Sequence, residues 1–139
     1  MAQDNEKLEK LAAELNQLQQ EMEMIKQQLE QLDMSLSEIS SAQLTLEGIM
    51  KNDTKETMVP IGAGCFIITE LKNTDEVVMG IGADIAIKQS TESTERTLKK
   101  QQNEIETVRN SLTQKLTEIT KYLNEKRPEA EALMQQQQQ

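Results

Sequence analysis

Residues 6–39 read EKLEKLAAELNQLQQEMEMIKQQLEQLDMSLSEI. Apolar side chains recur in this stretch at alternating steps of three and four residues, at Leu8, Leu11, Leu15, Leu18, Met22, Ile25, Leu29, Leu32, Leu36 and Ile39. An unbroken alternation of this kind is the heptad pattern of a coiled coil. Gln43 takes the next core position, and Leu46 and Met50 then resume the phase. The sequence therefore predicts a long coiled-coil helix over residues 5–50.

A second heptad segment covers residues 91–127, with Ser90 or Thr91 as the N-cap. Its apolar positions are less regular: Leu98, Ile105, Val108, Leu112, Leu116, Ile119 and Leu123. The two successive steps of four that follow Val108 predict a stutter, which locally unwinds a left-handed supercoil. Gln101 is expected to fill the core position between the first two apolar residues. This segment is predicted to be the C-terminal coiled-coil helix.

Pro128 follows that segment and is expected to end the helix. Proline has no backbone N–H and clashes with the preceding turn, at a cost of about 3 kcal/mol in a helix interior. Residues 128–139 are therefore expected to form a tail, frayed at first and disordered over the glutamine run Gln135–Gln139.

Residues 55–89 differ in composition, because β-branched residues and glycines replace the heptads. Four short strands are predicted, near residues 56–61, 65–72, 76–81 and 84–88. The turns Gly62-Ala63-Gly64 and Gly82-Ala83 would make two β-hairpins. Cys65 opens an apolar strand and is expected to be a small buried side chain.

The order helix, two hairpins, helix predicts one domain, mainly α with a small β centre, whose two helices form a long antiparallel coiled coil. Two isolated hairpins expose apolar faces and open edges in water. The β centre is therefore expected to assemble into an oligomeric β-barrel. The residues expected to drive this oligomerisation are Val59, Ile61, Phe66, Ile68, Val77, Ile81, Ile85 and Ile87.

The free tip of the coiled coil is a second candidate surface, because the helix break expected at Pro128 would leave part of the first helix uncovered. Apolar groups at a loosened end are either simple fraying or a binding surface. The candidate residues for binding there are Leu8, Leu11, Leu15, Leu123, Leu133 and Met134.

Composition argues against several classes of function. The 139 residues include no histidine and one cysteine, which excludes histidine-based catalysis and a Cys–Cys zinc site. Neither Gly62-x-Gly64 nor Gly80-x-Gly82 is followed directly by a helix or by a Lys-Ser/Thr pair. The sequence therefore shows no nucleotide-binding loop. The net charge of -9 argues against nucleic-acid binding. No apolar run is long enough to span a membrane. We therefore expect a cytoplasmic protein with no cofactor, and not an enzyme.

The centre of the chain resembles the prefoldin family of molecular chaperones. The resemblance rests on residues 59–64, VPIGAG, and 77–84, VVMGIGAD, between two heptad helices. The number of hairpins, two rather than one, resembles the α class of that family. The resemblance covers roughly residues 6–127.

This resemblance implies an assembly with β-class subunits, two α and four β, whose hairpins form a double β-barrel with projecting coiled coils. It implies an ATP-independent holdase that binds unfolded proteins near the coiled-coil tips and passes them to a group II chaperonin. The alternative from the residues alone is a coiled-coil adaptor or scaffold that binds one folded partner.

Overall fold

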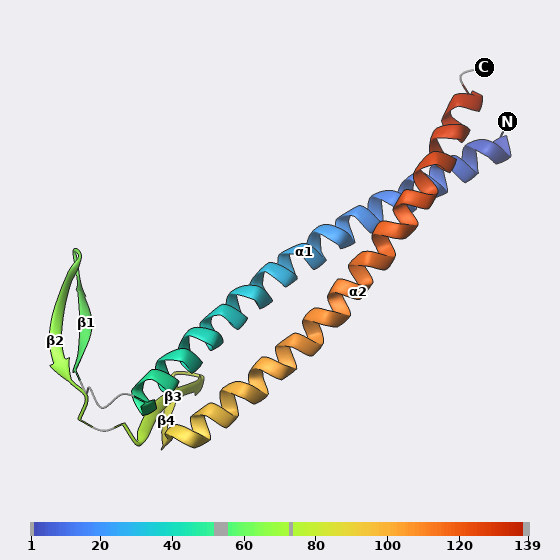
Figure 1. Cartoon of the computed structure of the whole chain (residues 1–139). Coiled ribbons are helices and arrows are strands. Elements are labelled where there is room, and N and C mark those ends of the chain that lie inside the picture. Colours follow the sequence, from blue (N-terminus) through green and yellow to red (C-terminus); the bar gives the residue numbers. More distant parts are fainter. Residues whose placement is uncertain (1, 52–55, 73, 138–139) are drawn as a thin grey trace. The chain divides into compact units, whose positions relative to one another are not determined.

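The computed structural model describes residues 2–51, 56–72 and 74–137 (Figure 1). Its elements in chain order are α1 (Ala2–Lys51), β1 (Glu56–Gly62), β2 (Cys65–Glu70), β3 (Glu76–Gly82), β4 (Ile85–Ser90) and α2 (Thr91–Gln137). The predicted fold class, two long helices and two antiparallel hairpins, is therefore confirmed. The chain divides into two compact units, residues 1–34 with 105–139 and residues 35–104.

The first unit is a two-helix pair held by an apolar seam. Ile25, Ile119 and Leu123 are buried at its centre, and further heptad residues pack around them: Leu15, Leu18, Met22, Leu29, Leu112 and Leu116. The helices run antiparallel, because Glu21 pairs with Lys115 while Asp33, further along α1, pairs with the earlier residue Arg109. Both chain ends accordingly lie at the same end of this unit (Figure 1).

The seam of α2 is more regular than the sequence suggested. Val108 is 50% exposed, and the half-buried position is taken by Arg109, whose Nε lies 2.6 Å from Asp33 Oδ1. Counted through Arg109, the steps from Ile105 onward are four, three, four, and the stutter predicted at Val108 is absent. The prediction was wrong because it followed apolar residues alone, whereas the long stem of an arginine can lie along a seam with its charged end at the edge.

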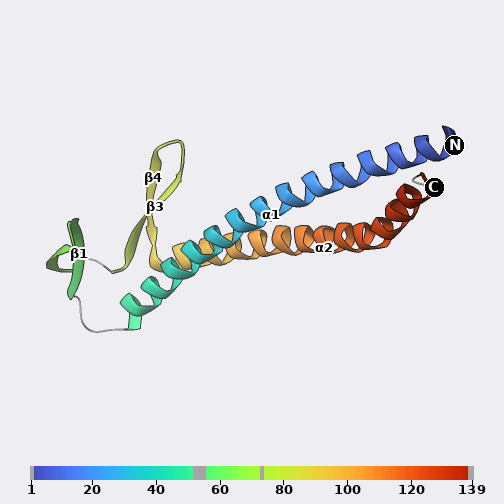
Figure 2. The same cartoon turned by 90° about the horizontal axis from the view of Figure 1, so that it is seen from above.

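Pro128 does not end α2, which continues to Gln137. The half-buried Ala130 and Leu133 keep the same alternation of three and four beyond the proline. Packing of this face outweighs the single missing N–H, and α2 bends in its last turns, drawn in dark red in Figure 2. The helix end expected at residue 127 and the disordered tail are therefore corrected over residues 128–137.

The second unit contains both hairpins, and their turns share one design. β1 pairs with β2 and β3 with β4, each with a register shift just before the turn. Ala63 and Gly64 have φ of 51° and 76°, and Ala83 and Asp84 have φ of 51° and 59°. Positive φ at both central residues is what a type I′ hairpin turn requires. Asp84 thus belongs to the turn and not, as predicted, to the last strand.

The start of α2 is tied to the second hairpin. Ser90 Oγ accepts the backbone N–H of Ser93 at 3.1 Å, so Ser90 is the N-cap. The Thr91 N–H donates to the Asp75 carbonyl at 2.9 Å, and the Thr91 hydroxyl donates to the Thr74 carbonyl at 2.7 Å. Thr91 is fully buried. These bonds fix β3 and β4 against the first turn of α2.

The helices of this unit also carry a polar pair on their buried faces. Gln43 Nε2 donates to Gln102 Oε1 at 3.2 Å, and both side chains are half-buried. Gln101, the residue predicted for the core, is exposed, as is Met50. The heptad phase of α2 therefore runs through Gln102.

Candidate functional site

The hairpins carry a set of large apolar side chains that no other described segment of the chain covers. Of the eight residues predicted for oligomerisation, Val77 is half-buried, and the other seven have exposed fractions between 40% for Ile87 and 67% for Ile68. An apolar surface of this kind marks an interaction site in a folded protein.

The first hairpin is apolar on both faces. Met58 lies opposite Ile68 and Pro60 opposite Phe66, so these four side chains share one face because side chains alternate along a strand. Val59 lies opposite Ile67, on the other face. Met58 and Ile67 are exposed but were missing from the predicted set. Pairing the strands about the Gly62-Ala63-Gly64 turn would have found both.

The second hairpin repeats the first at an offset of 20 residues, with the same pairing and the same turn position. The positions equivalent to Pro60, Phe66 and Ile68 hold Gly80, Ala86 and Lys88. Val78, which is 64% exposed, takes the place of Met58, so this face has smaller side chains than the first hairpin and one charge. Its opposite face carries Met79, Ile87, Val77 and Gln89, of which all but Ile87 are half-buried.

Cys65 lies beside the first turn and is exposed, so the prediction of a buried cysteine was wrong. Its hairpin, β1 and β2, is not packed against any other described segment of the chain. In the described part of the chain, no group of three or more His, Cys, Asp or Glu side chains could hold a metal ion. None of the described helices is long and apolar enough to cross a membrane.

The candidate tip residues divide into three groups. Leu8, Leu11, Leu15 and Leu133 are half-buried, and Met134 is 54% exposed. Leu123 is only 4% exposed and belongs to the core of the first unit. Its inclusion among surface residues followed from the expected break at Pro128, and its burial removes it from the candidate surface.

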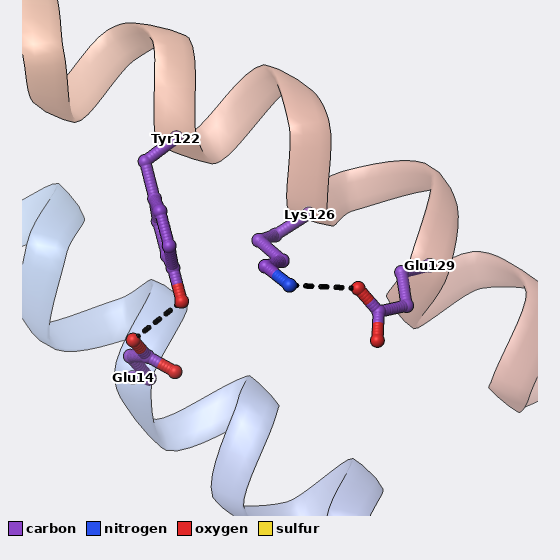
Figure 3. A network of polar contacts seen from close by, with 4 residues as sticks. All are labelled: Glu14, Tyr122, Lys126 and Glu129. Carbon is purple, nitrogen blue, oxygen red and sulfur yellow. Dashed lines mark hydrogen bonds and ion pairs between the residues drawn. The ribbon is translucent and has the colours of Figure 1, made fainter.

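A polar network lies next to the place where the buried core ends (Figure 3). The Tyr122 hydroxyl donates to Glu14 Oε1 at 2.7 Å, which joins the two helices. Lys126 Nζ lies 3.1 Å from Glu129 Oε2, across Pro128, and 5.8 Å from the centre of the Tyr122 ring. The bond to Glu14 raises the pKa of Tyr122, and the bond to Glu129 raises the pKa of Lys126.

Beyond this network the unit ends in an open groove of about 450 Å³, lined by Asp4, Asn5, Leu133, Gln136 and Gln137. The Gln137 side chain donates a hydrogen bond to Asn5 Oδ1 across the two helices. The groove at the end of the pair therefore combines polar side chains with the apolar Leu133.

The sequence and the fold both match known proteins. The family model described as "Prefoldin subunit" matches residues 18–136. A prefoldin subunit alpha of Methanosphaera stadtmanae is 50% identical over 134 residues, covering 96% of each chain. The prefoldin subunit alpha of Pyrococcus horikoshii is 30% identical and covers 99% of this chain and 94% of its own.

A cryo-EM structure of filamentous PFD from Methanocaldococcus jannaschii has a similar fold, with a TM-score of 0.67 over 80% of this chain and 93% of that one. At 17% identity this likeness concerns the fold alone.

Proposed function

The chain belongs to the prefoldin family as an α-type subunit, and we propose that it acts as an ATP-independent holdase within a hetero-oligomeric chaperone. Prefoldin subunits are chaperone subunits. The observation that carries the finer proposal is that each of the two units has an apolar surface of its own. One lies on the hairpins of the second unit, and the other at the open end of the helix pair.

The hairpin surface is the assembly surface. Ile61, Phe66, Ile68, Ile81 and Ile85 are each more than half exposed, which is costly for apolar side chains in water. Burying a side chain of this size contributes about 1.5–3 kcal/mol. We assign β-class subunits as the partners, in a ring of two α and four β subunits in which the hairpins close into β-barrels without open edges.

The tip surface is the client surface. Leu8, Leu11 and Leu133 are half-buried and lie outside the central core cluster, and Met134 is exposed. Unfolded proteins expose apolar segments that such groups can bind weakly. Several tips acting on one client raise the overall affinity through effective concentration, while each single contact stays weak enough for release.

Delivery to a group II chaperonin would use the charge of the same end. The 23 residues before Met24 carry six acidic and two basic side chains, a net charge of -4. An acidic end steers association toward a basic surface on a partner. The association rate with the chaperonin should therefore fall as salt rises, and a rate independent of salt would contradict this step.

The test separates client binding from assembly. Replacing Leu8, Leu11, Leu133 and Met134 with Ser removes the candidate tip surface but leaves Leu15 and Leu123 in the core. A matched control replaces Met24, Met34 and Leu44, which are exposed along α1 outside the tip, with Ser. Each variant is assembled with β-class subunits, its mass is measured, and light scattering follows the aggregation of several unrelated denatured clients.

We expect both variants to assemble with the mass of the unchanged complex. The tip variant should lose most of its suppression of aggregation, and the control should keep it. A tip variant that assembles and suppresses aggregation fully would refute client binding at the tip. An unchanged complex that binds a single folded partner and protects no client would instead favour the adaptor function.

A further inference from the structure

The helices of the second unit place two amides in a largely apolar seam. Gln43 and Gln102 are half-buried, hydrogen-bonded to each other at 3.2 Å, and 59 residues apart in the sequence. The nearest heptad positions, Ile39 and Leu46 on α1 and Leu98 on α2, are buried and apolar. From this pair we infer that the chain carries a register key, a polar contact that selects one alignment of α1 against α2.

The apolar seam alone does not select an alignment. Heptad positions along both helices hold leucine or isoleucine, among them Leu29, Leu32, Leu36, Leu112 and Leu116. Sliding one helix by a heptad exchanges one apolar neighbour for another. The main loss would be at the ends, where few side chains are buried. Regular coiled coils are for this reason prone to slipped registers.

The glutamine pair is satisfied in one alignment only. In an antiparallel pair, a slip of one heptad would place Gln43 opposite Glu95 or Arg109, and Gln102 opposite Leu36 or Met50. Gln102 would then face an apolar side chain in either direction. Gln102 would lose its hydrogen-bond partner there, whereas in the observed alignment the two amides satisfy each other.

A second polar pair, in the first unit, opposes the same slip. Arg109 occupies a heptad core position and contacts Asp33 at 2.6 Å. A slip would place Arg109 opposite Lys26 or Ser40, so the ion pair is lost in either direction and like charges meet in one. The two pairs act in separate units, yet each is compatible only with the observed alignment.

The register key determines where the helices end relative to each other. In the observed alignment, Gln137 of α2 reaches Asn5 of α1. A slip of one heptad would leave about two turns of one helix without a partner. This inference concerns the alignment of the helices and holds whether or not the tip binds clients.

The experiment measures the alignment directly in the full-length chain. Spin labels are attached to Glu38→Cys on α1 and Arg96→Cys on α2, both exposed positions, after the native cysteine is removed by Cys65→Ser. These positions are offset along the helix axes by about 16 Å in the observed alignment. A slip changes that offset to about 6 Å or about 27 Å, which pulsed electron paramagnetic resonance resolves.

The variant Gln43→Leu/Gln102→Leu removes the key without leaving an unpaired amide, and circular dichroism checks that it remains helical. The matched control Gln31→Leu/Gln101→Leu changes the same residue type at exposed positions. We expect one distance in the unchanged chain and in the control, and a second distance for at least a tenth of the molecules in the key variant. A single, unchanged distance in the key variant would overturn the inference.

Discussion

The two hairpins have the same strand pairing and turn, but the side chains on their faces differ in kind and in exposure. Their strand pairing, register shift and turn recur at an offset of 20 residues. The first hairpin has Met58, Phe66 and Ile68 exposed on one face and Val59 and Ile67 exposed on the other. The second has one face with smaller side chains, where the exposed Val78 lies opposite Lys88, and its other face is largely half-buried.

This difference shows that the turn residues and the strand side chains have separate roles. The turn residues form the hairpin, and the strand side chains determine what it contacts. Gly62 and Gly82 and the residues that follow them set the turn, and both turns have positive φ. The side chains between the turns decide how much of each hairpin needs a partner. Among the described residues, hydrogen bonds to a helix are found for the second hairpin, through Thr91, and not for the first. The first therefore depends most on contacts outside the chain.

The largest expected effect comes from giving the first hairpin the charge of the second. Ile68→Lys places at position 68 the residue found at the equivalent position 88. If the first hairpin is covered on both faces in the assembly, this change buries an unpaired charge. Such a charge costs on the order of 3 kcal/mol or more, about a hundredfold in association constant. The mass of the complex formed with β-class subunits measures the loss.

The control for this change is Lys88→Ile, which makes the second hairpin resemble the first. It adds an apolar group to a face that is already exposed, so assembly should persist. Normal assembly of the Ile68→Lys chain would mean that this face of the first hairpin stays in water, and the contrast between the hairpins would then have no role in assembly.

A smaller effect is expected where the second hairpin joins α2. Thr91→Val keeps the shape of a fully buried side chain and the N–H bond to Asp75, but removes the hydroxyl bond to the Thr74 carbonyl. The loss should destabilise the anchoring by about 1–3 kcal/mol, because the carbonyl is left without this partner. Hydrogen exchange in β3 and β4 should speed up by about fivefold or more, while exchange in β1 and β2 should not change.

Thr117→Val is the matched control for the anchor. The Thr117 hydroxyl also donates to a carbonyl, but to Thr113 on its own exposed helix face. Its removal should leave exchange in both hairpins unchanged. Equal exchange in the Thr91→Val and unchanged chains would show that the hairpin is held by other contacts.

The sequence predicted the architecture well because each element has a strong local signal. The heptads of α1 and the glycines of the two turns gave the helix pair, the hairpins and their pairing before any coordinates were considered. The family followed from the same glycine-marked centre. These features depend on neighbours within a few residues, and little else in the chain competes with them.

The errors arose where a distant contact outweighs a local preference. Pro128 lacks an N–H, but the seam continues through Ala130 and Leu133 and keeps the helix intact. Arg109 takes the core position that hydropathy assigns to Val108, and Gln102 takes the one that heptad spacing assigns to Gln101, because each has a polar partner on α1. Leu123 was predicted at the surface because α2 was expected to break at Pro128, and it is buried because the helix continues.

The smallest effect is expected at the turns, where the hairpins differ by one residue. Gly64 has φ of 76° and the equivalent Asp84 has φ of 59°. A Cβ atom at Gly64 would meet nothing within 4 Å, so a substitution there costs only its backbone conformation. Glycine adopts positive φ freely, whereas other residues pay up to about 1–2 kcal/mol, and Asp pays less because its side chain can bond locally.

Exchanging Gly64 and Asp84 tests whether the turn residue contributes to the difference in stability between the two hairpins. Gly64→Asp should speed hydrogen exchange in β1 and β2 by up to about fivefold, equivalent to roughly 1 kcal/mol, and Gly64→Ala should speed it more. Asp84→Gly should slow exchange in β3 and β4 by a similar factor. If Asp84→Gly speeds exchange instead, the carboxylate stabilises its turn by more than the backbone strain costs. The second hairpin would then owe part of its stability to Asp84 as well as to its anchor on α2.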